Sequence, residues 1–430
     1  MKAKNLWWGA VALASAAVVG SAAAFGVAVH NEYKDLHHEP AYVADTPEQM
    51  LTPNPDPAPA PAAGDVAAAL DKAFDKDALA TFGGAVIDTA SGEVVWEKDT
   101  DRPLTPASST KVLTTAAATW QLPEDERITT EVVRGQNPDN VVIKAAGDVW
   151  MSSAQIDELA EQVKKAVPNV AGVYVDTSAW AGDTQAPGWD PENIDEGFVA
   201  PMEPAMLYGG RQGAEGGDVP RSHTPAKDVA RALADKLGAQ TAEYGVAPAD
   251  ADVVASTQSA PLSERAEKMM KHSDNVMAEA IARELAASRG EEPSFAGDTA
   301  ATLAVLAEHG IDTHGVEIKD NSGLSTDNRI PAKTLAQVIA QGTEDAQLRP
   351  LLGYLPVAGG DGTLSDRYAD LSGRGYVRAK TGTLTGVSAL VGTVPGQSGA
   401  QYAFAFLIND GDLLGARQAQ DKLASALREQ

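Results

Sequence analysis

Three short motifs in this sequence carry side chains that could together perform acyl transfer through a serine. They are Ser108-Ser109-Thr110-Lys111, Ser273-Asp274-Asn275 and Lys380-Thr381-Gly382, and each pattern occurs once in the chain. A serine followed three residues later by a lysine is expected about once by chance in a chain of this length, so the first motif alone is weak. All three together are much harder to obtain by accident.

The residue types in these motifs suggest a role for each side chain. A serine hydroxyl is a poor nucleophile until a base removes its proton. Lys111 can be that base for Ser108 if its pKa is depressed, and the second ammonium of Lys380 would depress it by like-charge repulsion. Ser273 could relay the proton to a leaving nitrogen. The amide of Asn275 is both donor and acceptor, so it could hold Lys111 or a substrate amide in place.

The third motif is predicted to lie on a β-strand that binds substrate. Lys380 and the hydroxyls of Thr381 and Thr383 could hold an anion such as a terminal carboxylate. Gly382 has no side chain, so a substrate backbone could lie against the strand edge. The backbone N–H groups of Ser108 and Thr383 would then form an oxyanion hole. We expect Ser108 at the start of a helix, where the partial positive charge favours the same anion.

Composition and missing motifs exclude several other chemistries. The 430 residues include no cysteine, which excludes disulfides and thiol chemistry. The formal net charge of −26 argues against a nucleic-acid partner. No G-x-S-x-G, H-E-x-x-H or G-x-x-x-x-G-K-[ST] pattern is present. We therefore expect no metal and no cofactor, and interpret His37-His38 as a solvated pair and His272 as a helix-end residue.

The first 64 residues are predicted to lie outside the folded part. Lys2 and Lys4 precede an uncharged run, residues 6–29, which is typical of an export signal or a membrane anchor. Small residues at 21–24 would suit a signal peptidase, so residues 1–29 can be either a cleaved signal or an anchor. In both cases the rest of the chain lies outside the cell membrane. Residues 30–64, polar and then rich in proline, indicate an extended spacer.

Apolar periodicity and turn residues predict an α/β (α+β) fold. We predict a main domain formed by residues 65–125 and 223–430, with an α+β subdomain inserted at 126–222. Early and late strands can form one antiparallel sheet flanked by helices, which brings Ser108 and Lys380 together. In the main domain we expect a helix from residue 65, strands at 83–88 and 94–96, helices at 108–122, 225–237, 262–271, 298–309 and 332–341, a helix carrying Met277, Ile281 and Leu285, strands at 377–381, 387–394 and 401–407, and a helix at 413–427. In the insert we expect strands at 129–133, 141–144 and 173–175 and a helix at 153–167 capped by Ser152 or Ser153.

With these motifs in order, the chain resembles the low-molecular-mass class C penicillin-binding proteins. These are the D-alanyl-D-alanine carboxypeptidase/endopeptidases of bacterial cell walls. The resemblance runs from about residue 65 to the C-terminus. It rests on the three motifs and on four further segments, which are Ala146-Gly147-Asp148, Ala186-Pro187-Gly188-Trp189-Asp190, Asp320-Asn321-Ser322-Gly323-Leu324-Ser325 and Gly359-Gly360-Asp361-Gly362-Thr363-Leu364.

The resemblance implies a β-lactamase/transpeptidase-like fold and an acyl-enzyme on Ser108. The partners it implies are peptidoglycan stem peptides ending in D-Ala-D-Ala, with β-lactams as inhibitors. Asp148 would bind the free amino end of the stem peptide's side chain. Lys111 would be the general base. Ser273 and Asn275 would provide the proton relay and the positioning. Lys380, Thr381 and Thr383 would be the carboxylate and oxyanion groups.

One departure from this family concerns the insert. Class C members usually carry two inserted subdomains between the first two motifs, and residues 126–222 are too few for both. We expect residues 320–325 to form a structural loop near the site.

Two alternatives to a serine D,D-peptidase stay open. A β-lactamase or esterase on the same scaffold is disfavoured by the insert and by the lack of a dedicated deacylating carboxylate, and a non-catalytic envelope binding protein is disfavoured by three intact motifs.

Overall fold

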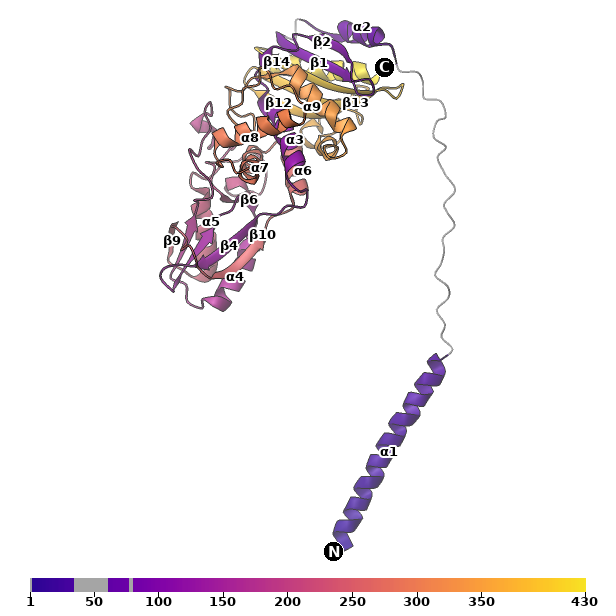
Figure 1. Cartoon of the computed structure of the whole chain (residues 1–430), viewed down its shortest axis with the longest axis vertical. Helices are drawn as coiled ribbons and strands as arrows, with labels where there is room; N and C mark the ends of the chain where they lie inside the picture. Colours follow the sequence, from indigo (N-terminus) through magenta and orange to yellow (C-terminus); the bar gives the residue numbers. More distant parts are fainter. Residues whose placement is uncertain (1, 35–60, 77–79) are drawn as a thin grey trace. The chain divides into compact units, whose positions relative to one another are not determined.

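The computed structural model describes residues 2–34, 61–76 and 80–430 (Figure 1). Contacts divide the chain into two units, Met1–Pro57 and Ala58–Gln430. In the first unit the described residues form helix α1 (Lys2–Tyr33). Over the described residues, no helix combines the length and the apolar character needed to cross a membrane. Most of the predicted spacer, including His37-His38, falls outside the described residues, and the export signal or anchor stays a prediction.

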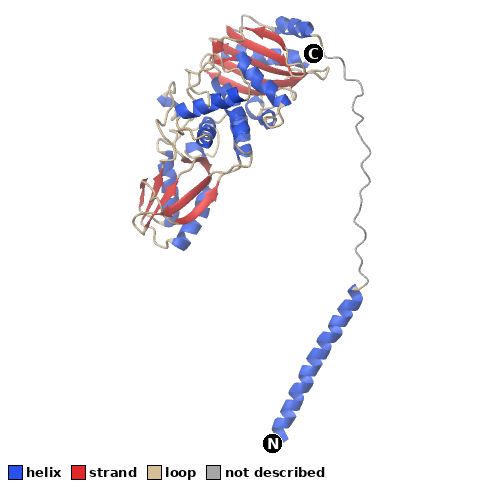
Figure 2. Ribbon diagram, in the orientation of Figure 1, coloured by secondary structure: helices blue, strands red, loops and turns tan. Residues whose placement is uncertain are grey.

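One five-stranded antiparallel sheet forms the centre of the second unit, which confirms the predicted fold class (Figure 2). Its strand order is β12-β13-β14-β1-β2. Early and late strands meet in it, since Thr81 of β1 pairs with Asn409 of β14. Strand β12 lies at the edge, so one side of its backbone has no neighbouring strand. The bounds are β1 Thr81–Asp88, β2 Val94–Lys98, β12 Arg378–Leu384, β13 Val387–Pro395 and β14 Gln401–Asn409.

Helices cover both faces of this sheet because both faces are apolar. Successive side chains of a strand point to opposite faces. Along β14, Ala405 and Leu407 therefore belong to one core cluster and Phe404 and Phe406 to another. Helix α9 (Ala332–Glu344) covers the first face, with α3 (Lys111–Gln121) packed behind it, and α11 (Leu413–Arg428) and α2 (Ala63–Ala73) cover the second.

Four further helices pack in the same core cluster as α3. They are α6 (Leu262–His272), α7 (Asn275–Ser288), α8 (Phe295–Glu308) and α10 (Pro350–Tyr354). The predicted end of α9 at residue 341 is wrong, because the helix continues through Gly342 to Glu344. Gly342 is buried, and a Cβ there would lie 3.3 Å from Leu352 of α10. The glycine therefore serves close helix packing rather than helix termination.

A second five-stranded sheet lies in the insert, with the order β10-β4-β5-β7-β9. Helices α4 (Ser153–Ala166) and α5 (Pro225–Leu237) pack on it. Helix α4 begins with Ser152 in a capping box, as the sequence predicts. The strands are β4 Thr129–Arg134, β5 Asn140–Lys144, β7 Gly172–Asp176, β9 Thr241–Tyr244 and β10 Val253–Gln258.

The predicted end of the insert at residue 222 is wrong. Helix α5 forms as expected, but its buried Val229 and Leu233 belong to the core of the second sheet rather than of the first. Strand β10 then pairs with β4, as Val253 does with Val133. The insert therefore extends to Gln258. An amphipathic pattern predicts that a helix packs on an apolar surface, but not which surface.

The two ends of the insert meet where it leaves the main domain. The backbone N–H groups of Leu262 and Ser263 donate to the carbonyls of Glu126 and Glu124, each at 2.9 Å.

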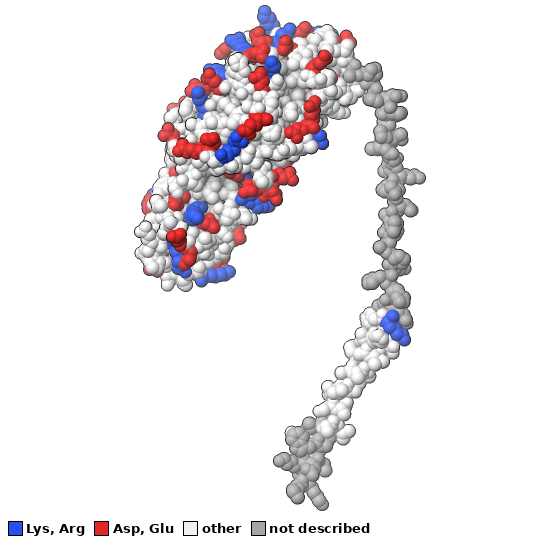
Figure 3. All heavy atoms as spheres, in the orientation of Figure 1, with Lys and Arg blue, Asp and Glu red and all other residues white. Residues whose placement is uncertain are grey.

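Acidic and basic side chains are interspersed over the face of the molecule shown in Figure 3. Short elements complete the structure: the pairs β3 (Pro103–Leu104) with β11 (Ile330–Pro331) and β6 (Asp148–Met151) with β8 (Ala205–Leu207), and the 3-10 turns Ala107–Thr110, Pro191–Asn193, Tyr208–Gly210 and Gly362–Leu364.

Candidate active site

Ser108 lies in a tight turn that leads into α3. Ala107, just before it, has φ of 47°, a left-handed conformation that is uncommon for a residue with a side chain. Two neighbouring hydroxyls hold the turn: Ser109 donates to the carbonyl of Pro106 at 2.7 Å, and Thr110 donates to that of Ala107 at 2.9 Å. The turn leaves Ser108 partly exposed while Ser109 and Thr110 are buried. The predicted helix thus begins with a 3-10 turn, and Ser108 lies at its start.

Lys111 is the centre of the predicted catalytic group. Its Nζ lies 3.1 Å from Ser108 Oγ, 2.6 Å from Asn275 Oδ1 and 2.7 Å from the carbonyl oxygen of Ser322. Burial lowers the pKa of Lys111 to about 8, although the negative charges of Asp320, Asp274 and Glu279 raise it. The sequence predicts a depressed pKa from the charge of Lys380, whereas the structure gives burial as the largest cause.

Ser273 and Lys380 form a second pair. Ser273 ends α6 in a left-handed conformation with φ of 58°, which turns the chain between α6 and α7. Lys380 Nζ donates to Ser273 Oγ at 2.8 Å and to the carbonyl of Thr381 at 2.9 Å. Burial, and then the charge of Lys111, hold the pKa of Lys380 well below its ordinary value. The structure therefore brings both serines into contact with a buried lysine.

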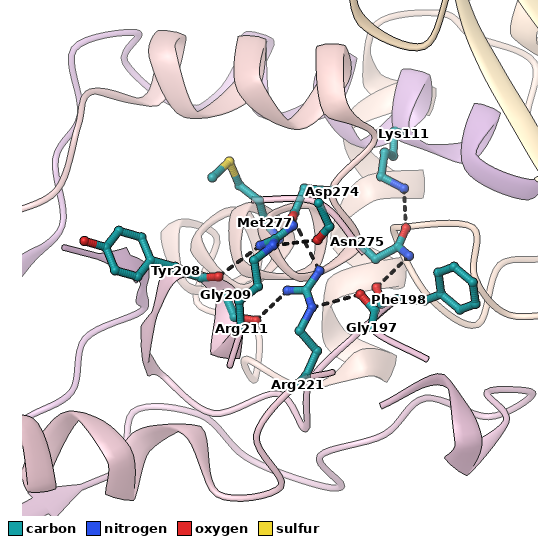
Figure 4. A network of polar contacts seen from close by, with 11 residues as sticks. Lys111, Gly197, Phe198, Tyr208, Gly209, Arg211, Arg221, Asp274, Asn275 and Met277 are labelled. Atoms are coloured by element: carbon teal, nitrogen blue, oxygen red, sulfur yellow. Dashed lines mark hydrogen bonds and ion pairs between the residues drawn. The ribbon is translucent and has the colours of Figure 1, made fainter. Parts of the chain in front are cut away.

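Asn275 joins the insert to the catalytic group (Figure 4). Its Oδ1 accepts a hydrogen bond from Lys111 Nζ, and its Nδ2 donates to the carbonyl of Phe198 at 3.0 Å. Phe198 lies in the insert and is 39% exposed. The amide of Asn275 is thus fixed from both ends, so its oxygen faces the lysine.

Asp274, the middle residue of the second motif, is held by two arginines of the insert (Figure 4). Arg211 Nη2 lies 2.9 Å from its Oδ2 and Arg221 Nη2 lies 4.0 Å away. Its Oδ1 accepts from Met277 N at 2.8 Å and so caps α7. The charges of the two arginines hold the pKa of Asp274 below its ordinary value in spite of burial. Sequence reasoning missed Arg211 and Arg221, because a charge partner far along the chain leaves no local pattern.

Strand β12 presents alternate backbone groups at its free edge. The N–H of Ala379 donates to the carbonyl of Pro356 at 3.0 Å, so it points away from β13. Because successive N–H groups of a strand alternate between its two edges, those of Thr381 and Thr383 face the free edge too. The pairing of β12 with β13 runs without a register shift. The Thr383 N–H therefore faces the edge as the predicted oxyanion hole requires.

Gly382 packs against the turn that carries Ser108. A Cβ on Gly382 would lie 2.5 Å from the carbonyl oxygen of Pro106 and 3.2 Å from the Cβ of Ala107. Any side chain here would push the serine away from the strand. This contact gives the glycine a structural reason in addition to the predicted approach of a substrate backbone.

The segment Asp320–Ser325 is a buried structural loop, as predicted, and it also supports Lys111 through the carbonyl of Ser322. A Cβ on Gly323, whose φ is +81°, would collide with the carbonyl of Ala107. The fully buried carboxylate of Asp320 organises the loop. It accepts five hydrogen bonds, from Trp189 Nε1 at 2.7 Å, Ser322 Oγ at 3.0 Å, Gly323 N at 2.9 Å, Ser325 N at 2.8 Å and Asn328 Nδ2 at 2.6 Å.

Glu279 is a second buried carboxylate under the site, and sequence reasoning missed it. It accepts from the N–H groups of Asn321 at 3.1 Å and Ser322 at 2.7 Å. Burial raises its pKa to about 8, and the charge of Asp320 adds to the effect. The available signal was a glutamate on the apolar side of α7, one turn after Asn275.

The structure does not bring Asp148 together with these residues. Its carboxylate is 2% exposed and accepts from Trp150 N at 3.1 Å and Gln155 Nε2 at 3.0 Å. Burial raises the pKa of Asp148. Both oxygens thus serve the turn that leads into α4, which is the structural role of an aspartate after glycine. A contact between Asp148 and a substrate amine stays a prediction.

The chain is similar in sequence to known carboxypeptidases. The chain matches the sequence profile described as the D-Ala-D-Ala carboxypeptidase 3 (S13) family over residues 66–220 and 212–430. It is 44% identical over 385 residues to carboxypeptidase DacB of Mycolicibacterium smegmatis, covering 84% of each chain. It is 29% identical over 443 residues to a D-alanyl-D-alanine carboxypeptidase of Actinomadura sp., covering 81% of each.

The fold is also that of a solved structure. Penicillin-binding protein 4 (dacB) of Haemophilus influenzae superposes with a TM-score of 0.70 at 21% identity, covering 84% of this chain and 97% of that one. The same protein, solved in complex with a β-lactam, gives a TM-score of 0.64 at 22% identity, covering 83% of this chain and 97% of that one.

Proposed function

Because the chain belongs to the D-Ala-D-Ala carboxypeptidase 3 (S13) family, it is a penicillin-binding serine D-alanyl-D-alanine carboxypeptidase, and we propose that Ser108 is its nucleophile. The observation that carries this assignment is the contact of Ser108 with Lys111, a buried lysine whose pKa is lowered to about 8. A neutral amine at hydrogen-bond distance from a hydroxyl can act as its general base.

Acylation uses the groups around Ser108. The neutral amine of Lys111 takes the hydroxyl proton while Ser108 Oγ bonds to the carbonyl carbon of the penultimate D-alanine. The carbonyl oxygen becomes an oxyanion, which the N–H groups of Ser108 and Thr383 receive. Asn275 keeps Lys111 in place throughout, because its own amide is anchored on Phe198.

Departure of the leaving amine uses the second pair. The bond between the carbonyl carbon and the amide nitrogen breaks, and the nitrogen needs a proton. Ser273 can give its hydroxyl proton to this nitrogen and recover the proton that Lys111 took from Ser108, which leaves Lys111 neutral again, while Lys380, 2.8 Å away, holds the Ser273 oxygen in place. Free D-alanine leaves, and an ester on Ser108 remains. Water then attacks the ester with Lys111 again as base, which releases the shortened peptide.

The test is the pH dependence of D-alanine release from a synthetic peptide ending in D-Ala-D-Ala. Only the neutral form of Lys111 can accept the proton, and below its pKa of about 8 that form decreases about tenfold per pH unit. We therefore expect kcat/KM to rise about tenfold between pH 6 and pH 7 and to level off above pH 8. A flat profile from pH 5.5 to 9 would contradict Lys111 as the base.

We also propose that the chain is exported, since peptidoglycan lies outside the cytoplasmic membrane and Lys2 and Lys4 precede an uncharged run. Fractionation of cells that express the full chain should find the protein in the envelope or the medium, accessible to external protease. A variant with Asp in place of Val18 and Val19 should remain in the cytoplasm. Equal export of the wild type and the variant would contradict this proposal.

A further inference from the structure

Asn275 can hold Lys111 only while its own amide keeps one orientation. That orientation depends on the insert, because Asn275 Nδ2 donates to the carbonyl of Phe198 at 3.0 Å. Residues 194–204, which include Phe198, form neither helix nor strand. The backbone N–H of Phe198 donates to the carbonyl of Asn193 at 2.9 Å, but no ladder of hydrogen bonds fixes this stretch as it would fix a strand. A side chain from elsewhere is needed to hold it.

Arg221 supplies that support. Its Nε donates to the carbonyl of Gly197 at 2.8 Å, and its Nη1 donates to the carbonyl of Gly209 at 2.6 Å (Figure 4). Its backbone N–H donates to the carbonyl of Ile194 at 2.9 Å. The side chain is 2% exposed, so water does not compete for these carbonyls. Arg221 therefore binds the peptide group directly ahead of Phe198.

The backbone around Gly197 is also closely packed. Gly197 has φ of +88°, and a Cβ there would collide with the carbonyl of Val219, two residues before Arg221. The segment that carries the arginine thus lies directly against the segment that leads to Phe198. A change at Arg221 is transmitted to the Phe198 carbonyl through this contact as well as through the hydrogen bond.

The charge of Arg221 faces the other side of the same motif. Its Nη2 lies 4.0 Å from Asp274 Oδ2, too far for a hydrogen bond, whereas Arg211 Nη2 lies 2.9 Å from that oxygen. Burial lowers the pKa of Arg221 to about 10, and the charge of Asp274 opposes this, so the guanidinium is protonated at neutral pH. The positive charge lies near the residue before Asn275, while the short hydrogen bonds hold the stretch that anchors Asn275.

We propose that Arg221 is a positioning residue of the reaction: through the backbone ahead of Phe198 it keeps Asn275 on Lys111. This inference rests on the proposed function, in which Lys111 takes the proton of Ser108. It gives the insert a part in catalysis that requires no contact with the substrate.

The experiment is a double-mutant cycle on the full-length enzyme. The four proteins are the wild type, Arg221→Met, Asn275→Ala and the variant with both changes. Release of D-alanine from a peptide ending in D-Ala-D-Ala is followed by mass spectrometry, and kcat is expressed per folded molecule, with the folded fraction measured by tryptophan fluorescence. Arg134→Met is the matched control, because Arg134 also lies in the insert and donates to a backbone carbonyl, that of Ala166 at 2.9 Å.

We expect Arg221→Met to lower kcat by about 10- to 100-fold and to change KM by less than about twofold, since a misplaced base costs rate without removing a substrate contact. Arg221→Lys should be intermediate, because lysine keeps the charge but lacks the planar fork that reaches two carbonyls. The double variant should have the kcat of Asn275→Ala within about twofold, because the effect of Arg221 passes through Asn275. Arg134→Met should match the wild type.

Losses that multiply in the double variant would show that Arg221 acts by another route and would overturn the inference. So would an Arg221→Met enzyme with the kcat of the wild type, or one changed in KM alone. If Arg221→Met does not fold, the same cycle with Arg221→Lys decides in its place. All these outcomes leave the peptidase intact, whereas a wild type that releases no D-alanine would overturn the proposed function together with this inference.

Discussion

Replacing Ser108 with alanine is expected to abolish the covalent adduct with benzylpenicillin and to lower D-alanine release by at least about 10⁴-fold. The physical reason is that the neighbouring hydroxyl cannot replace it: Ser109 is buried and donates to the carbonyl of Pro106. Intact-protein mass spectrometry after incubation with the drug measures the adduct directly. The wild type should gain the mass of one benzylpenicillin molecule, and Ser108→Ala should gain none.

The control for this experiment is Ser109→Ala, which removes the other serine of the first motif and should still form the adduct. An adduct on Ser108→Ala would show that another residue is the nucleophile. If the wild type instead destroyed the drug quickly without retaining it, fast deacylation would favour the β-lactamase alternative. An unchanged drug and an unmodified wild type would favour a non-catalytic binding protein.

Replacing Asp320 with alanine is expected to lower the free energy of unfolding by about 4 kcal/mol, a value near the upper end for single substitutions. The carboxylate is fully buried and accepts five hydrogen bonds, so its removal leaves several buried donors without an acceptor. The loop it organises also supplies the Ser322 carbonyl that receives Lys111. Acylation by benzylpenicillin should therefore slow as well, even in molecules that remain folded.

The measurement is urea-induced unfolding followed by tryptophan fluorescence, since Trp189 donates to Asp320 directly. Asp327→Ala is the matched control on the following turn. Asp327 is exposed, so the change should stay within about 0.5 kcal/mol. Equal stability of the two variants would show that the loop does not depend on the buried carboxylate.

The sequence predicted most of the main sheet and the grouping of the side chains of the candidate active site. Strands β13 and β14 are buried along almost their whole length, so their apolar pattern is strong. The contacts of Lys111 with Ser108 and Asn275 could be predicted because the motifs occur in the order known for penicillin-recognising serine enzymes. A predicted helix end was wrong where a glycine serves helix packing instead of helix termination, as Gly342 does in α9.

Other features could not be read from the sequence because they depend on which distant elements meet. The strand Val253–Gln258 is short and half-exposed, and only its pairing with β4 places it in the insert. Asp148 and Glu279 are both buried acidic residues, yet one closes a turn and the other anchors the loop under Lys111. Residue type gives the capacity to bind, while the partner is set by the fold.

The meeting of early and late strands in one sheet has a consequence for synthesis of the enzyme. Strand β1 leaves the ribosome long before β14, with which it pairs from Thr81↔Asn409 to Asp88↔Tyr402. Until β12 is also made, Ser108 has neither the Thr383 N–H nor the Lys380–Ser273 pair. A nascent or prematurely terminated chain therefore holds Ser108 without the rest of the proposed site, and we expect it to release no D-alanine. Activity begins only when translation is almost complete, and the long-range pairing that imposes this order also makes folding slow.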